Sequence, residues 1–219
     1  MAQKMFPITE VVKILRREMP KYQEPIVGKY AREKSPFKVL ISTLLSLRTK
    51  DLTTAPACDR LFAVADNPDK LAALSPSTIE KLIFPVGFYK VKAKTLISVS
   101  QLLIEKYDRK VPDDLDELLT IKGVGRKTAN LVVTLGYGKP GICVDIHVHR
   151  ISNRWGYIKT ETPDKSEFVL REVLPKKFWL EYNDLLVTYG QNLCVPVSPF
   201  CSKCPIDKFC SRVGVKKSR

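Results

Sequence analysis

Histidine is scarce in this sequence of 219 residues, and His147 and His149 are the only two. No third ligand is evident that would complete a zinc site with them. Long apolar runs are missing too, and no stretch approaches the ~20 residues that cross a membrane. The first 20 residues form a charged amphipathic pattern instead of an apolar signal core. These absences predict an intracellular protein, in which structural disulfides are not expected.

Strand-like alternation is also rare, and helical spacing of apolar residues dominates. This spacing is found in residues 8–18, 37–47, 97–107, 128–135 and 166–174. Glycine or proline breaks fall at 28, 35–36, 85–87, 123–125, 136–141 and 196–199. The pattern predicts an all-α protein without a long linker or a solenoid repeat.

Acidic residues are outnumbered, with 23 against 37 basic residues and a net charge of +14. Such an excess favours a polyanionic partner, and nucleic acid is the first candidate. Many basic proteins bind nothing specific, so the partner has to be inferred from motifs.

A glycine turn between two helical patterns is the first such motif, "LLTIKGVGRKTANLVV" at 118–133. Glycines permit a tight hairpin, and the amides that begin the second helix can hold a phosphate. Lys122, Arg126 and Lys127 would add positive charge. The alternative is an ordinary helical hairpin with a solvated basic turn.

Lys127 stands where the helix dipole disfavours a cation. If the side chain is partly withdrawn from water, this position favours loss of its proton, and a neutral amine is a nucleophile. The alternative is a surface lysine in solvent. Asp145, in "GICVDIHVHRISNRWG" (141–156), reads first as an N-cap, but its apolar approach also suggests partial burial.

Four of the six cysteines lie in the last quarter of the chain, in the pattern C-x6-C-x2-C-x5-C formed by Cys194, Cys201, Cys204 and Cys210. Four thiolates this close can bind either tetrahedral zinc or a four-iron cluster. A single C-x2-C pair with longer arms favours iron–sulfur over a zinc ribbon, although composition does not decide. Cys58 and Cys143 are expected to be small buried residues.

Taken together, these motifs resemble the helix–hairpin–helix DNA glycosylases, in the endonuclease III branch. The matching segments occur in the family's order and are 36–51, 86–96, 118–133, 144–156 and 194–210. The resemblance implies an all-α, two-lobed glycosylase fold with a helix–hairpin–helix motif (about 115–134) and a C-terminal iron–sulfur loop. One lobe would be a helical barrel at 29–139. The other would combine 1–28 with 140–219 and hold a 4Fe-4S cluster on the four cysteines.

The resemblance also implies roles for single residues. Lys127 corresponds to the lysine that attacks C1′ of the damaged nucleotide, and Asp145 to the assisting aspartate. Branches that only remove the base have tyrosine or serine at the lysine position, so Lys127 implies a bifunctional glycosylase and AP lyase. The leading hypothesis is that it acts on oxidised pyrimidines. DNA contacts are expected from Arg48, Phe88, Lys122, Gly123, Gly125, Arg126 and His147.

Three residues depart from the family pattern. Arg48 replaces the glutamine that fills the gap left by the extruded base, which leaves the opposite-base preference open. Phe88 replaces the usual leucine wedge, and Lys122 adds a charge at the hairpin turn.

Two alternatives are a mismatch-directed glycosylase of the same superfamily and a non-catalytic structural DNA-binding protein. Lys127 argues against the first, and Lys127 with Asp145 against the second. We expect the partner to be damaged double-stranded DNA. We expect a monomeric, cytoplasmic, nucleoid-associated protein from a prokaryote, without a membrane association.

Overall fold

The computed structural model describes residues 6–22, 33 and 35–219, and the described residues contain helices and no strand. The chain divides into a middle unit, Ile26–Gly141, and a terminal unit, Met1–Pro25 with Ile142–Arg219. The predicted boundary at residues 28 and 29 lies outside the described residues, as does the predicted break at Gly28. At the other boundary, the sequence predicted a division after residue 139, and the structure divides after Gly141.

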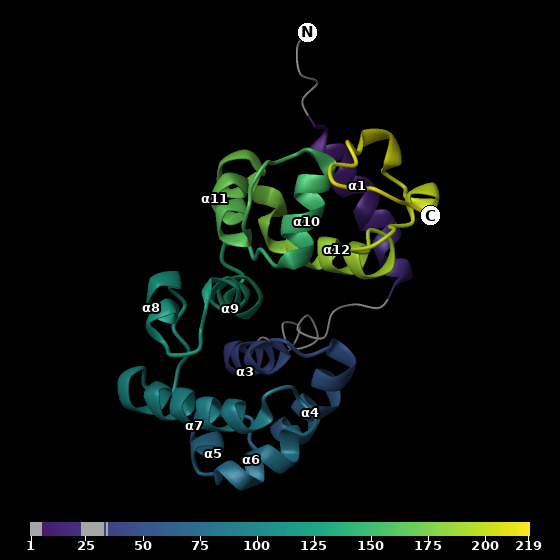
Figure 1. The fold of residues 1–219 in the computed structure, drawn as a ribbon. Coiled ribbons are helices and arrows are strands. Elements are labelled where there is room, and N and C mark those ends of the chain that lie inside the picture. Colours follow the sequence, from purple (N-terminus) through teal and green to yellow (C-terminus); the bar gives the residue numbers. More distant parts are fainter. Residues whose placement is uncertain (1–5, 23–32, 34) are drawn as a thin grey trace. The chain divides into compact units, whose positions relative to one another are not determined.

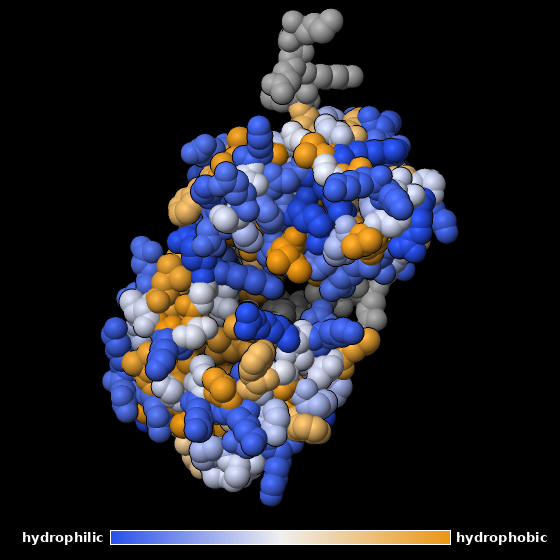
Figure 2. All heavy atoms as spheres, viewed as in Figure 1, coloured by the Kyte–Doolittle hydropathy of each residue, from blue (hydrophilic) through white to orange (hydrophobic). Residues whose placement is uncertain are grey.

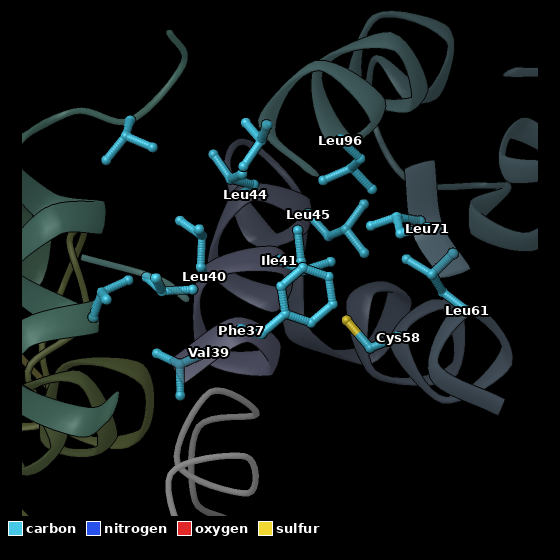
Figure 3. Packing of buried hydrophobic residues seen from close by; sticks show 14 of the residues in the cluster. Phe37, Val39, Leu40, Ile41, Leu44, Leu45, Cys58, Leu61, Leu71 and Leu96 are labelled. Carbon is cyan, nitrogen blue, oxygen red and sulfur yellow. The ribbon is translucent and has the colours of Figure 1, made fainter. Parts of the chain in front are cut away.

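The middle unit is built around α3, which is buried on almost every side and contacts α4, α7 and α9. Its elements are α3 (Pro36–Ser46), α4 (Asp51–Val64), α5 (Pro68–Ala72), α6 (Pro76–Ile83), α7 (Tyr89–Lys106), α8 (Leu115–Thr120), α9 (Arg126–Leu131) and the π-helical turn η2 (Val132–Gly136). Figure 1 shows α4, α5, α6 and α7 grouped on one side of α3. Labelled members of this core in Figure 3 include Leu40, Ile41, Leu44 and Leu45 of α3, Cys58 and Leu61 of α4, and Leu96 of α7.

The terminal unit has α12 at its centre, in contact with α1 and α10, and α10 also contacts α11. Its elements are α1 (Ile8–Glu18), η1 (Met19–Lys21), α10 (Ile146–Trp155), α11 (Pro163–Val173), η3 (Lys176–Phe178), α12 (Trp179–Asn192), η4 (Cys201–Lys203) and η5 (Asp207–Phe209). Its largest buried side chains are those of Trp155, Phe178, Tyr182 and Tyr189. The N-terminal helix and the C-terminal part of the chain therefore share one core.

Four helices begin in the same way, with a polar N-cap followed by proline. Ser35, Asn67, Ser75 and Thr162 each accept a hydrogen bond from the amide three residues later. The backbone amides of the first turn have no acceptor within the helix, and the capping side chain provides one. Proline at the first helical position has no amide hydrogen that needs an acceptor. These local signals fix where α3, α5, α6 and α11 start.

The surface of both units is mainly hydrophilic on the face shown in Figure 2, with scattered apolar side chains. Phe88 (62% exposed), Ile146 (66%) and Val197 (81%) are among the most exposed large apolar residues of the described chain. No helix in the described residues is long and apolar enough to cross a membrane.

Candidate active site and cysteine pocket

The predicted hairpin is confirmed as α8, a glycine turn and α9. Gly123 has φ +91°, and a Cβ at that position would lie 3.1 Å from Cγ2 of Thr95. The positive φ favours glycine there, and the short contact leaves little room for a side chain. Gly125 is the N-cap of α9 and provides no side-chain cap, and a Cβ built on it meets nothing within 4 Å. The backbone at the start of α9 is therefore open to close approach.

Lys127 is the second residue of α9 and is half-buried, like Arg126 before it. The next turn enters the core, where Thr128 and Ala129 are fully covered. Lys122 is exposed on the turn itself. The structure thus places the three predicted cations, with Gly123 and Gly125, on one short basic turn.

Asp145 is the N-cap of α10 and is only 8% exposed. Its Oδ1 accepts hydrogen bonds from the amides of His147 at 2.8 Å and Val148 at 2.9 Å. The predicted N-cap and the predicted burial are both confirmed. Because both bonds go to Oδ1, the carboxylate is fixed in orientation while Oδ2 takes no part in the cap.

The first turn of α10 is anchored against α12. Arg150 Nη2 lies 3.2 Å from Nδ1 of His147 and donates to the carbonyl of Cys194 at 3.0 Å. A Cβ on Gly190 of α12 would lie 2.5 Å from the same Nδ1. His147 is therefore held by close packing, next to Asp145. His149 bonds Ser166 instead, with 2.7 Å between Nδ1 and Oγ, and burial lowers its pKa.

Arg48 and Phe88, which are 40 residues apart in sequence, meet in the middle unit. The guanidinium carbon of Arg48 lies 5.8 Å from the centre of the Phe88 ring, a cation–π distance. Arg48 follows α3, Phe88 precedes α7, and both side chains are exposed. The two predicted duplex-contacting residues therefore form one surface feature.

The four predicted cysteine ligands line a single pocket, together with Arg154, Tyr189 and Phe200 among others. The hydroxyl of Tyr189 lies 2.9 Å from Sγ of Cys204, and the amide of Arg212 donates to Sγ of Cys210 at 3.4 Å. Burial raises the pKa of Cys204, and raises that of Cys210 to about 11. The thiols of Cys204 and Cys210 therefore favour the protonated form unless a metal displaces the protons. As predicted, Cys58 and Cys143 lie apart and are buried.

Arg154 was missed by the sequence analysis, although it is one of the main supports of this loop. It is buried, and its guanidinium donates to the carbonyls of Val195 at 2.7 Å and Pro196 at 2.5 Å and approaches Sγ of Cys194 at 3.5 Å. The sequence signal that could have identified Arg154 is its position one residue before the buried Trp155, on the covered side of α10.

The donor set of the pocket is four thiols. Zinc holds four sulfurs about 2.3 Å from one centre, which brings them close to one another. Within the described part of the chain, no three His, Cys, Asp or Glu side chains converge in this way. Four thiols in one pocket are a donor set that either a zinc ion or a four-iron cluster can use.

Comparison with known proteins identifies relatives over most of the chain. Residues 41–176 match the model of the HhH-GPD superfamily base excision DNA repair protein. Endonuclease III of Thermotoga maritima is 45% identical over 82% of this chain and 84% of its own. Two chloroplastic endonuclease III homologues of Arabidopsis thaliana also match, and the chain spans about half of their length.

Two of the solved structures that share the fold are endonuclease III–DNA complexes. A non-covalent endonuclease III–DNA complex superposes with a TM-score of 0.82 at 30% identity and covers 94% of each chain. A trapped endonuclease III–DNA covalent intermediate, an estranged-adenine complex, gives a TM-score of 0.76 at 35% identity, over 81% of this chain and 84% of its own. The all-helical fold predicted from the motifs is thus confirmed.

Proposed function

This chain belongs to the HhH-GPD superfamily of base excision DNA repair proteins, in its endonuclease III branch, and on that premise we propose that Lys127 is the nucleophile of a bifunctional DNA glycosylase and AP lyase. The enzyme binds damaged duplex DNA, removes a base and then cleaves the strand. The observation that carries the assignment is a half-buried lysine in the first turn of the helix that follows the hairpin. A relative was solved as a covalent DNA intermediate, and covalent capture requires such a nucleophile.

The reaction begins when the damaged nucleotide leaves the base stack, which costs least for a weakly paired or damaged base. The neutral amine of Lys127 attacks C1′, the bond from C1′ to the base breaks, and the base leaves with the electron pair and takes up a proton. The bound amine loses a proton, and the lone pair of Nζ then breaks the bond from C1′ to the ring oxygen O4′, which takes up a proton as the sugar ring opens. The product is an iminium ion between Nζ and C1′. Its positive charge acidifies the C2′ proton. Loss of that proton expels the 3′ phosphate by β-elimination, and hydrolysis of the imine frees the lysine.

Asp145 is proposed to assist this step. Its Oδ1 is occupied by the two amides of the α10 cap, so Oδ2 is the oxygen available for chemistry. It would either accept a proton from the attacking amine or stabilise positive charge on the sugar. The cap bonds fix its orientation in advance.

The DNA contacts are proposed on two surfaces of the middle unit and on single residues of the terminal unit. The amides and cations of the hairpin turn, from Lys122 to Arg126, would hold the phosphate backbone near the lesion. The pair formed by Arg48 and Phe88 would enter the duplex, with Phe88 as wedge and Arg48 in the gap left by the extruded nucleotide. An arginine in that gap donates hydrogen bonds only, so the opposite base would be selected by its acceptors. His147, half-buried at the start of α10, would add a contact beside Asp145.

We further propose that Cys194, Cys201, Cys204 and Cys210 hold a 4Fe-4S cluster. When bound, the cluster supplies four iron–sulfur bonds that cross-link a segment with little regular structure of its own. Arg154 already ties the first part of this segment to α10. Lys203 and Lys208, both exposed between the ligands, would then face DNA phosphates. We propose that the enzyme acts on oxidised pyrimidines, as a monomer.

The test is covalent trapping with borohydride on a duplex that contains one oxidised pyrimidine. Borohydride reduces the imine, so an adduct that maps to Lys127 is expected. Lys127→Gln should bind the same duplex and give neither adduct nor cleavage, whereas Lys110→Gln, an exposed lysine elsewhere in the middle unit, should behave as the wild type. Base release without an adduct would mean that water attacks C1′, and unchanged cleavage by Lys127→Gln would remove Lys127 as the nucleophile.

A further inference from the structure

Lys92, which the sequence analysis did not single out, reaches from the first turn of α7 back to the end of α3. Its Nζ lies 2.7 Å from the carbonyl of Leu45, 2.6 Å from that of Leu47 and 3.2 Å from Oγ1 of Thr49. The last carbonyls of a helix have no partner within it, so a cation there satisfies them. Lys92 therefore fixes the chain where it leaves α3, on both sides of Leu47.

Thr49 connects the end of α3 to a second segment, the turn before α7. Its Oγ1 accepts from the amide of Gly87 at 3.1 Å and donates to the carbonyl of Leu47 at 3.4 Å. The two segments are also in close contact, since a Cβ on Gly87 would lie 3.1 Å from the carbonyl oxygen of Arg48. Lys92, Thr49 and Gly87 thus form one connected chain of hydrogen bonds.

The residues that project from these two segments are Arg48 and Phe88, and both have a left-handed backbone. The φ angles are 56° for Arg48 and 58° for Phe88. Such angles are unfavourable for side chains of this size and persist only where the surroundings fix them. Arg48 directly precedes Thr49 in the sequence, and Phe88 directly follows Gly87.

We propose that Lys92 is a positioning residue for base removal: through Thr49 it locks the segment after α3 to the turn before α7 and so presents Arg48 and Phe88 to the duplex as one unit. This inference rests on the proposed function of those two residues. It adds a requirement that concerns Arg48 and Phe88 together. The wedge and the gap-filling residue must keep a fixed separation, because they enter neighbouring steps of the same duplex.

The protonation state of Lys92 matters to this arrangement. An ammonium group has three hydrogens, one for each of the three acceptors, whereas a neutral amine has two. Burial lowers the pKa of Lys92 to about 8, although the nearby Cys58 opposes the shift. The full set of bonds is therefore present at neutral pH.

The variant Lys92→Met removes the three bonds and keeps the length of the side chain. Lys106→Met is the matched control, because it removes an exposed lysine from the opposite end of the same helix. Single-turnover base removal from a lesion-containing duplex should fall by about 10- to 100-fold in Lys92→Met, the range expected for a misplaced contact. Cleavage of a preformed abasic site in single-stranded DNA should stay within about twofold of wild type, since no duplex has to be entered.

A second measurement is independent of activity. Amide hydrogen exchange at Gly87 and Phe88 should accelerate at least about tenfold in Lys92→Met, because the bond from Gly87 to Thr49 loses its support. Thr49→Val, which removes the relay and keeps its shape, should have the same effect on Gly87. Exchange in α4 should not change in either variant.

The proposal is overturned if Lys92→Met removes bases from duplex DNA as fast as Lys106→Met. It is also overturned if both activities fall together with the melting temperature, which would indicate general destabilisation. If the wild type acts on no lesion, the proposed function fails. The exchange at Gly87 then decides separately whether Lys92 fixes the turn.

Discussion

Asp145 has a structural role and a proposed chemical role, and substitution can separate them. The cap needs only an acceptor oxygen at the position of Oδ1, which bonds the amides of His147 and Val148. The chemistry needs a negative charge. Asparagine keeps the oxygen and loses the charge, whereas alanine loses both.

The size of each effect follows from these contacts. Asn is as good an N-cap as Asp, so Asp145→Asn should cost only the interaction of the charge with the helix dipole, about 0.3–1 kcal/mol. Asp145→Ala also leaves two amides of a buried cap without a partner, and about 1–2 kcal/mol is expected. For a chain of this size, each kcal/mol lowers the melting temperature by about 2–4 °C.

Base removal should respond equally to the two substitutions. A positioned proton acceptor or charge contributes about 10²- to 10⁴-fold, so both variants should lose that much of the single-turnover rate. The assay is glycosidic bond cleavage on a lesion duplex at saturating enzyme, alongside thermal unfolding of the same preparations. If Asp145→Asn retains the wild-type rate, or unfolds as early as the alanine variant, the division of roles between the two oxygens is wrong.

Three further outcomes follow from the structure. Gly190→Ala would place a Cβ 2.5 Å from Nδ1 of His147, and such overpacking should cost about 1–3 kcal/mol in chemical denaturation; an unchanged midpoint would show that α10 and α12 separate freely. Reversing the charge of Lys203 and Lys208 together should weaken duplex binding and reduce the dependence of the affinity on salt, as measured by titration at several salt concentrations. If neither the affinity nor its salt dependence changes, the cysteine loop is not a DNA contact. Burial lowers the pKa of Lys92 from 10.5 to about 8, so between these pH values the folded state binds fewer protons than the unfolded state. The free energy of unfolding should therefore rise with pH across that window. The rise should be less steep in Lys92→Met.

Local signals made much of the site predictable from sequence. The glycine turn, the N-cap at Asp145 and the spacing of the cysteines each depend on neighbouring residues. The structure has the turn and the cap in the expected form, and it brings the four cysteines to one pocket. The start of α7 was less visible. The helix begins at Tyr89, eight residues before the predicted periodic segment, because Lys90, Lys92 and Lys94 interrupt the apolar spacing of its first two turns.

Burial on several sides hides a helix in a different way. The segment that forms α12 was not predicted, since Tyr182, Asn183, Leu186 and Val187 are all covered and no single apolar face remains to give a period. This helix packs against α1 and α10 and carries Gly190, which fits closely to His147. The centre of a helical unit is thus the part that periodicity reveals least.

Lys92 and Arg154 show the limit of motif reading most directly. Each is a cation whose main partners are backbone carbonyls of another segment, at Leu45 and Leu47 in one case and at Val195 and Pro196 in the other. A carbonyl has the same chemistry in every residue, so such a pairing leaves no trace in the residue types that receive it. The residues that would touch DNA or a cluster can be recognised by their chemistry, whereas the residues that hold them in place can be found only once the chain is folded.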